Sequence, residues 1–170
     1  MSPKSHTFVV ALLVVVALAS PAQGSRANSY LAPAGYCRGA WAGVMICLHD
    51  YARRQAGLPP LHESFQLTQA ARAKSADITR CGFSHTACRH ELDYRIDWAG
   101  YRWSAVGENL AWGSGSLGRP YALFSAWMRS PGHRANILSL SFRDFGIAVR
   151  RAPFAGYANA AVWVAEFARH

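Results

Sequence analysis

The sequence predicts an α+β fold in which helices come first and an antiparallel pair of strands comes last. In the early part of the chain, apolar residues recur at helical spacing, as at Val44 and Leu48. Near the end the spacing changes to two, and Phe145, Ile147 and Val149 alternate with other residues. Helices and strands that are segregated along the chain are typical of an α+β sandwich.

Two long helices are expected in the first half. The first runs from Trp41 to Ala56 and ends at Gly57, a natural helix stop. The second covers residues 65–79, with Ser64 as its N-cap. One mostly apolar face of this second helix consists of Leu67, Ala70, Ala71, Lys74 and Ile78.

The middle of the chain alternates between loops and short helices. A loop over residues 80–90 is followed by a short helix over 91–98. The segment A-V-G-E-N-L-A-W-G, residues 105–113, is interpreted as rich in turns because of its glycines. A helix then begins at Pro120, which suits a first helical turn, and continues to Met128.

Residues 130–132, Ser-Pro-Gly, interrupt the helical pattern, and residues 133–138 form a final turn. The two strands follow. The second strand is recognised by the alternation of Val162, Val164 and Glu166, and a loop over residues 152–160 joins it to the first.

The chain is divided into a signal peptide over residues 1–22, an N-terminal tail over 23–39 and one domain over 40–170. The apolar run from Phe8 to Ala19 is short, and small residues follow it, as in a cleavable secretory signal. An uncleaved N-terminal anchor is the alternative. We therefore expect a secreted, extracellular or periplasmic protein with no stable membrane span after cleavage.

Four cysteines, Cys37, Cys47, Cys81 and Cys88, are an even number in an exported chain, which favours two disulfides. Three pairings are possible. The local ones are Cys37–Cys47 and Cys81–Cys88, and we adopt them as the prediction. A zinc–thiolate site is the alternative, but the cysteines lack the C-x-x-C spacing of such sites.

The chain is strongly basic, with eighteen Lys and Arg against nine Asp and Glu and a net charge of +9. One interpretation is attraction to anionic cell-envelope polymers or lipids. The other is compositional bias, with arginines scattered singly over the surface. Nucleic acid is not an expected partner, because the chain carries no recognised binding motif and is exported.

Three residues are the candidates for a functional site: His85, Glu108 and His133. Two imidazoles and a carboxylate can coordinate a divalent metal, or they can exchange protons as acid and base. A purely structural network is the third possibility. Asn109 could donate or accept at the rim of the same site, but local bonding to the backbone of its turn is the expected role. Arg134 and Asn136 are expected to lock the loop after His133.

Several motifs, in this order and spacing, resemble the CAP superfamily of cysteine-rich secretory, antigen 5 and pathogenesis-related proteins, in its short bacterial SCP-like form. They are F-S-H (83–85), V-G-E-N-L-A-W-G (106–113), W-M-R-S-P-G-H-R-A-N-I-L (127–138), F-G-I-A-V (145–149) and W-V-A-E-F (163–167). The resemblance covers roughly residues 44–167.

The resemblance implies an α-β-α sandwich with a central antiparallel sheet flanked by helices. It also implies a cleft in which His85, Glu108 and His133 hold a divalent ion such as zinc or magnesium. The longer members have a second glutamate after the tryptophan that corresponds to Trp127. This chain has Met-Arg-Ser there, so one cleft acid is missing.

The expected function is a secreted, monomeric, non-enzymatic binding module whose cleft takes a metal and a small lipidic or anionic ligand. The alternative is a metal-assisted hydrolase or protease in the cell envelope or outside the cell, with His85, Glu108 and His133 as its catalytic candidates. A third possibility is an adhesive envelope protein that binds through its charge.

Overall fold

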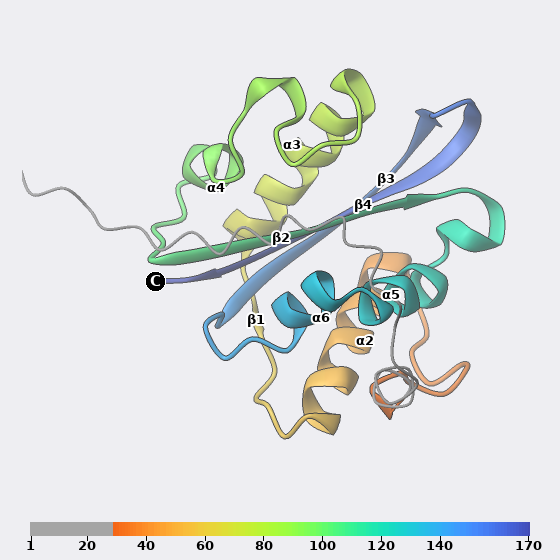
Figure 1. Cartoon of the computed structure of the whole chain (residues 1–170), viewed down its shortest axis with the longest axis vertical. Helices are drawn as coiled ribbons and strands as arrows, with labels where there is room; N and C mark the ends of the chain where they lie inside the picture. The colour runs from red at the N-terminus through yellow and green to blue at the C-terminus, as the bar shows by residue number, and fades with distance from the viewer. Residues whose placement is uncertain (1–28) are drawn as a thin grey trace, which may run out of the picture.

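A four-stranded sheet separates two layers of helices in the computed structural model, which describes residues 29–170 (Figure 1). The strand order is β1-β3-β4-β2, so β1 and β2 are the edges. The bounds are β1 His62–Glu63, β2 Ala105–Gly113, β3 Asp144–Phe154 and β4 Tyr157–Arg169. The predicted signal peptide, residues 1–22, and the first part of the predicted tail lie outside the described residues.

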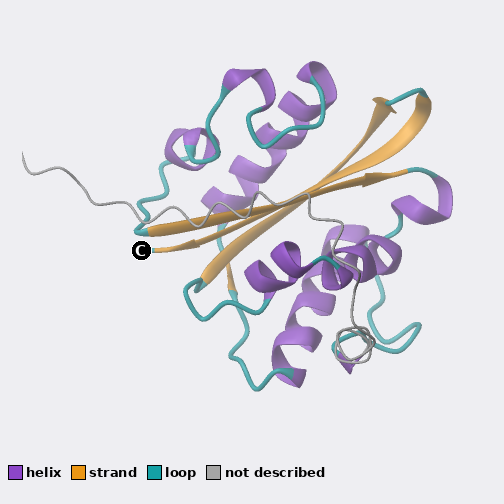
Figure 2. Cartoon of the chain, in the orientation of Figure 1, coloured by secondary structure: helices purple, strands orange, loops and turns teal. Residues whose placement is uncertain are grey.

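Helices cover both faces of the sheet, as Figure 2 shows by colour, and the expected α-β-α sandwich is confirmed. One layer holds α3, Phe65–Cys81, with α4, Tyr94–Trp98, packed beside it. The other layer consists of α2 Trp41–Gln55, α5 Pro120–Arg129 and α6 Pro131–Ile137. Two 3-10 turns, Ala87–Arg89 and Gly115–Gly118, connect these elements. The sheet is antiparallel except that β1 pairs in parallel with β3.

The helix ends follow local signals. The Ser64 side chain accepts a hydrogen bond from the backbone N–H of Leu67 at 3.3 Å, which confirms it as the N-cap of α3. Pro120 occupies the first turn of α5, where its missing N–H costs nothing. Ser130 ends α5 and also precedes the first turn of α6, so the Ser-Pro-Gly sequence separates two helices.

The interpretation of residues 105–113 as a turn-rich segment is wrong, because they form strand β2. Two of the glycines that suggested turns serve close packing. A Cβ on Gly107 would lie 2.7 Å from the Phe142 ring, and one on Gly113 would lie 2.6 Å from the Leu117 carbonyl oxygen. The missing side chains therefore let β2 approach its neighbours.

The hairpin between β3 and β4 is tighter than expected. The loop predicted over residues 152–160 shrinks to Ala155 and Gly156, which have φ values of 50° and 84°. Two central residues with positive φ match the right-handed twist of paired strands. The proline in this region lies at an irregularity in the β3–β4 register, between Ala152 and Phe154.

The N-terminal segment is fastened to the domain by the disulfide Cys37–Cys47, which reaches α2. The backbone N–H of Cys37 also donates to the Tyr121 hydroxyl of α5 at 2.7 Å. The second disulfide is Cys81–Cys88, and no described cysteine is free. The bridges are those of the local pairing, and they leave no thiolate for a zinc site.

His49 of α2 is fully buried in the core between the sheet and α5. Its ring centroid lies 5.1 to 5.9 Å from the rings of Phe124, Trp127, Phe145 and Phe167. The imidazole Nδ1 pairs with the Met45 carbonyl at 2.8 Å. Burial lowers the pKa of His49 to about 4, and the nearby Arg53 charge also lowers it.

We expect His49 to make the fold sensitive to mild acid. Between pH 6.5 and 4 the unfolded chain takes up a proton on this imidazole and the folded chain does not. The free energy of unfolding should therefore fall by about 3 kcal/mol over that window. Urea unfolding of the wild type and His49→Leu across this range measures the difference. Equal slopes in the two proteins would contradict the assignment.

Candidate functional site

The candidate site lies at the edge strand β2, where parts of both helical layers meet. Glu108 lies in the middle of β2, His85 in the loop after α3, and His133 in α6. The Nδ1 atom of His85 is 2.7 Å from Oε1 of Glu108. Burial lowers the pKa of His133, and the charge of the nearby His85 lowers it further. The structure thus brings the three predicted residues to one place.

Register explains how Glu108 comes to face α3. Glu108 pairs directly with Glu166 of β4, and Glu166 pairs with Gly146 of β3. Directly opposed residues point to the same face of a sheet. A Cβ on Gly146 would meet the backbone of Leu67 and Thr68 in α3, so all three residues lie on the α3 face.

Lys74 of α3 reaches the same buried carboxylate. Its side chain is 1% exposed, and Nζ lies 3.7 Å from Oε2 of Glu108. The same ammonium donates to the backbone carbonyl of His85. The sequence placed Lys74 only in the apolar face of its helix. The signal in the sequence that could have revealed its role is a lysine within an otherwise apolar helical stripe, which indicates a buried partner for the charge.

Glu166 is a second buried acid that sequence reasoning missed. It is 0% exposed and lies directly opposite Glu108. Burial raises the pKa of Glu166 well above its usual value, the Glu108 charge raises it further, and Lys74 opposes both effects. The surroundings of Glu166 thus favour the neutral form of its carboxyl. The available signal was a glutamate inside the apolar W-V-A-E-F run.

His133 is positioned by two asparagines. The Asn109 side chain donates to the backbone carbonyl of His133 at 3.0 Å, so its predicted local bonding within a turn is wrong. Asn136 donates to Oδ1 of Asn109 at 2.9 Å and to the carbonyl of Glu108 at 3.3 Å. Arg134 donates to the Met128 carbonyl at 3.1 Å. Arg134 and Asn136 thus hold their segment in place as expected, but the segment is helix α6 rather than a loop.

The loop that carries His85 is anchored on Asp77 of α3. Arg95 donates to this carboxylate twice, at 2.7 and 2.8 Å, and Arg80 donates at 3.0 Å. His90 Nδ1 lies 3.1 Å from the second oxygen. Together with the disulfide Cys81–Cys88, these contacts fix both sides of the loop.

Comparison with known proteins shows the family of this chain. The profile of the CAP, or cysteine-rich secretory protein, family matches residues 47–167. The chain belongs to the CAP family. The match includes His85, Glu108 and His133, and it agrees with the resemblance seen in the motifs.

Relatives support the CAP fold. The protein YkwD of Bacillus subtilis is 30% identical over 131 residues, which are 75% of this chain and 47% of YkwD. The chain thus spans about half the length of that relative. An extracellular SCP-domain protein from Bacillus anthracis has a TM-score of 0.63 at 24% identity, covering 74% of this chain and 39% of its own.

Two further solved structures share the fold. An outer surface protein of Borrelia burgdorferi has a TM-score of 0.64 at 16% identity, covering 75% of this chain and 90% of its own. A cysteine-rich secretory protein of Staphylococcus aureus has a TM-score of 0.61 at 18% identity, covering 81% of this chain and 40% of its own. The structural neighbours are thus described as extracellular, secretory or surface proteins. None of the described helices has the length and apolar character that a membrane crossing requires.

The CAP resemblance implies a zinc or magnesium ion on His85, Glu108 and His133, and the described residues do not fit one. Within residues 29–170, no three His, Cys, Asp or Glu side chains are grouped so that they can hold a metal. Oε1 of Glu108 is hydrogen-bonded to Nδ1 of His85, and Oε2 forms an ion pair with the Lys74 ammonium. In this CAP domain the carboxylate orients an imidazole and balances a cation.

The remaining chemistry of the site is that of two imidazoles over a buried charge pair. With Nδ1 of His85 on Glu108, Nε2 is the ring nitrogen left for a ligand. The His85 side chain is 38% exposed, so solvent reaches it. Ser84 Oγ accepts from the Thr86 N–H at 3.0 Å and pairs with its hydroxyl at 3.1 Å, so this serine is engaged within its own loop.

Proposed function

We propose that this CAP domain is a non-enzymatic binding module that acts outside the cell and binds a small ligand through an acidic group. The observation that carries the proposal is the His85–Glu108 pair, a half-exposed imidazole on a buried carboxylate, with His133 beside it. An imidazole N–H can donate to a carboxylate or phosphate oxygen, and a bare ring nitrogen can accept from a ligand hydroxyl. Two disulfides support an oxidising, extracytoplasmic location.

The surroundings of His85 favour an anionic ligand. A pocket of about 550 Å³ lies on the cysteine loop next to the site; Ser84 and Thr86, the neighbours of His85, line it, and His85 itself does not. Arg80, Arg89 and His90 also line it, and no carboxylate does. Guanidinium groups and hydroxyls are suitable partners for carboxylate or phosphate oxygens.

A lipidic ligand is supported by the apolar neighbour of the site. The Phe83 side chain is 46% exposed and lies two residues before His85. An exposed aromatic ring beside polar groups suits a molecule with an acidic head and an apolar tail. We therefore choose laurate, a twelve-carbon carboxylate, as the first probe and inorganic phosphate as the second.

Hydrolysis is the second candidate function, because a histidine held by a carboxylate is also the arrangement of a general base. Neither a cysteine thiol nor the serine next to His85 is free to act as the nucleophile. All described cysteines are in disulfides, and Ser84 is engaged with Thr86. A metal-bound water is not supported by the arrangement of Glu108. Binding is therefore the function that the geometry supports best.

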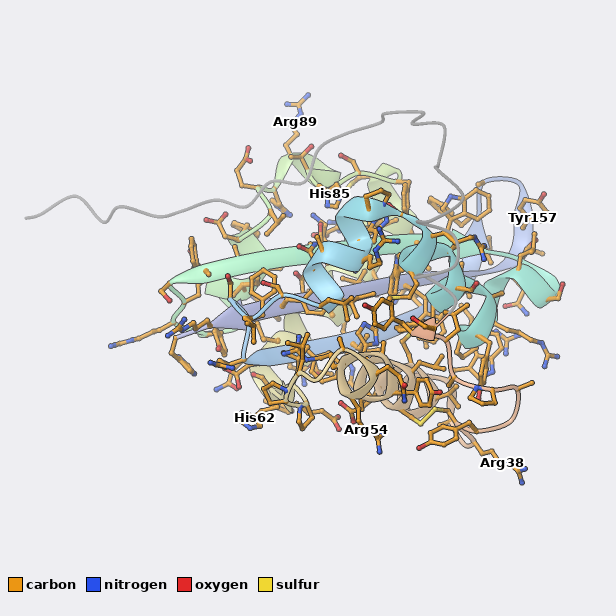
Figure 3. All side chains as sticks on the ribbon, turned by 60° about the horizontal axis from the view of Figure 1, so that its bottom comes forward. Arg38, Arg54, His62, His85, Arg89 and Tyr157 are labelled. Carbon is orange, nitrogen blue, oxygen red and sulfur yellow. A yellow bond between two sulfur atoms is a disulfide. The ribbon has the colours of Figure 1, made fainter. Side chains whose placement is uncertain are left out.

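The test follows the imidazole resonances of the oxidised protein by NMR during titration with laurate below its micelle concentration, and then with phosphate. We expect saturable shifts at His85 and His133. His85→Ala/His133→Ala should weaken binding at least tenfold, because it removes both ring nitrogens. His62→Ala is the matched control, since Figure 3 places His62 far from His85.

Each outcome of this titration has a separate meaning. Binding of laurate alone identifies a lipidic ligand, and binding of both probes identifies the acidic group as sufficient. Undiminished binding by the double variant would refute the site. Turnover of 4-nitrophenyl laurate that is lost in the double variant would favour the hydrolase instead.

A further inference from the structure

Glu108 is a buried carboxylate, and its charge must be balanced inside the protein. Its side chain is 0% exposed, and an unpaired buried charge is strongly unfavourable. The expected balancing charge in this family is a bound divalent ion. In this chain a cation is already present within the fold, on Lys74.

The position of Lys74 along α3 leads its side chain to Glu108. Lys74 lies four residues after Ala70 and four before Ile78, which are both fully buried, so it belongs to the stripe that faces the sheet. The four-carbon stem crosses the apolar layer and brings Nζ to 3.7 Å from Oε2 of Glu108.

The Lys74 ammonium contacts both the strand β2 and the loop after α3. Besides facing Glu108, Nζ donates to the backbone carbonyl of His85, the residue whose imidazole occupies the other Glu108 oxygen. One cation thus ties the carboxylate of β2 to the loop after α3. A metal ion on Glu108 would have to displace the imidazole or share the carboxylate with a buried positive charge.

We infer that the Lys74 ammonium replaces the divalent cation of the expected CAP site, so that the charge of Glu108 is balanced without a metal. A divalent ion at Glu108 would lie close to this ammonium in a region of low dielectric, where repulsion between like charges is strong. The missing acid after Trp127 agrees with this reading, because one lysine needs fewer carboxylates than a divalent ion.

The inference concerns the same site as the proposed function but not its ligand. It states which cation supports Glu108, whichever molecule binds to the imidazoles. Its test uses zinc alone, so zinc binding can overturn this inference and leave the laurate result unchanged.

The experiment is titration of zinc chloride into the oxidised, chelator-treated protein, followed at the His85 imidazole resonances. We expect no saturable zinc shift of His85 in the wild type. Lys74→Met keeps the length of the stem and removes the charge, so it should bind zinc at His85 at least tenfold more tightly than the wild type. Lys74→Arg keeps the charge and should resemble the wild type.

A double variant assigns any gain to the carboxylate. Lys74→Met/Glu108→Gln should lose the zinc binding that Lys74→Met acquires. If Lys74→Met does not fold, Lys74→Gln replaces it, because its amide still donates to the His85 carbonyl without a charge. Saturable zinc binding at His85 in the wild type would overturn the inference, and so would the absence of a gain in the folded neutral variant.

Discussion

Replacing Gly146 by alanine is expected to lower the free energy of unfolding by about 3 kcal/mol or more, although it adds only one methyl group. The new Cβ would lie 2.1 Å from the carbonyl carbon of Leu67 and 2.1 Å from the backbone N of Thr68. These are backbone atoms of α3, so no side-chain rotation relieves the clash. The helix itself has to move away from the sheet.

The same displacement should disturb the candidate site. α3 carries Lys74, and its C-terminal end leads into the loop of His85. A shift of α3 away from β3 therefore separates both residues from Glu108 on β2. We expect the surviving folded fraction of Gly146→Ala to show a changed His85 imidazole resonance and a weakened response to the ligand probes.

Gly43→Ala is the matched control for this substitution. Gly43 lies in α2, and a Cβ there would meet nothing within 4 Å. Alanine is the better helix former by about 1 kcal/mol, so this variant should be as stable as the wild type or slightly more so. Urea unfolding of the three proteins measures the effect. Equal stability of Gly146→Ala and Gly43→Ala would show that α3 does not pack on Gly146 as described.

The elements that could be predicted from the sequence are those whose signals are local. α3 is set by Ser64 and by its own apolar stripe, and α5 by Pro120, so neither needed knowledge of the rest of the fold. β2 could not be found in this way. Its glycines looked like turn formers. In the fold, Gly107 leaves room for the ring of Phe142, which lies far along the chain, and Gly113 leaves room for the backbone of Leu117 in the turn that follows.

The site was predictable only as far as its residue types are unusual. His85, Glu108 and His133 stood out in their motifs, and the structure brings them together at β2. The partners of Glu108 depend on long-range register, because Glu166 opposes it only when β4 pairs with β2. Lys74 faces it only when α3 lies over that pair. Neither contact can be predicted from the spacing of residues along the sequence.

Replacing Asp77 by alanine should destabilise the fold by about 3–5 kcal/mol, the usual cost of removing one member of a buried ion pair. The Asp77 side chain is 2% exposed, and its partner Arg95 is 15% exposed. The substitution leaves this guanidinium largely buried without its carboxylate. His90 loses the same partner.

The effect should be largest in the loop that carries His85, because His90 and Arg95 both bond to Asp77 from the segment after α3. Hydrogen exchange of the backbone amides of residues 82–100 should accelerate more than that of β3 and β4. Asp93→Asn removes an acid from the same region and is the control. Uniform acceleration across the domain would indicate that Asp77 supports only global stability.

The pH dependence separates Asp77 from His49. Burial alone would raise the pKa of Asp77, but hydrogen bonds from Arg95 and His90, with their charges, outweigh it and lower this pKa. A carboxyl with a lowered pKa stabilises the fold above its unfolded value of about 3.9, and this contribution is lost as the pH falls through the folded value. The stability difference between the wild type and Asp77→Ala should thus persist down to about pH 4 and narrow below it. The His49 effect develops above pH 4, so the two residues act in adjacent windows. If the difference already vanished near pH 6, the ionised Asp77 carboxylate would not be the group that anchors the loop.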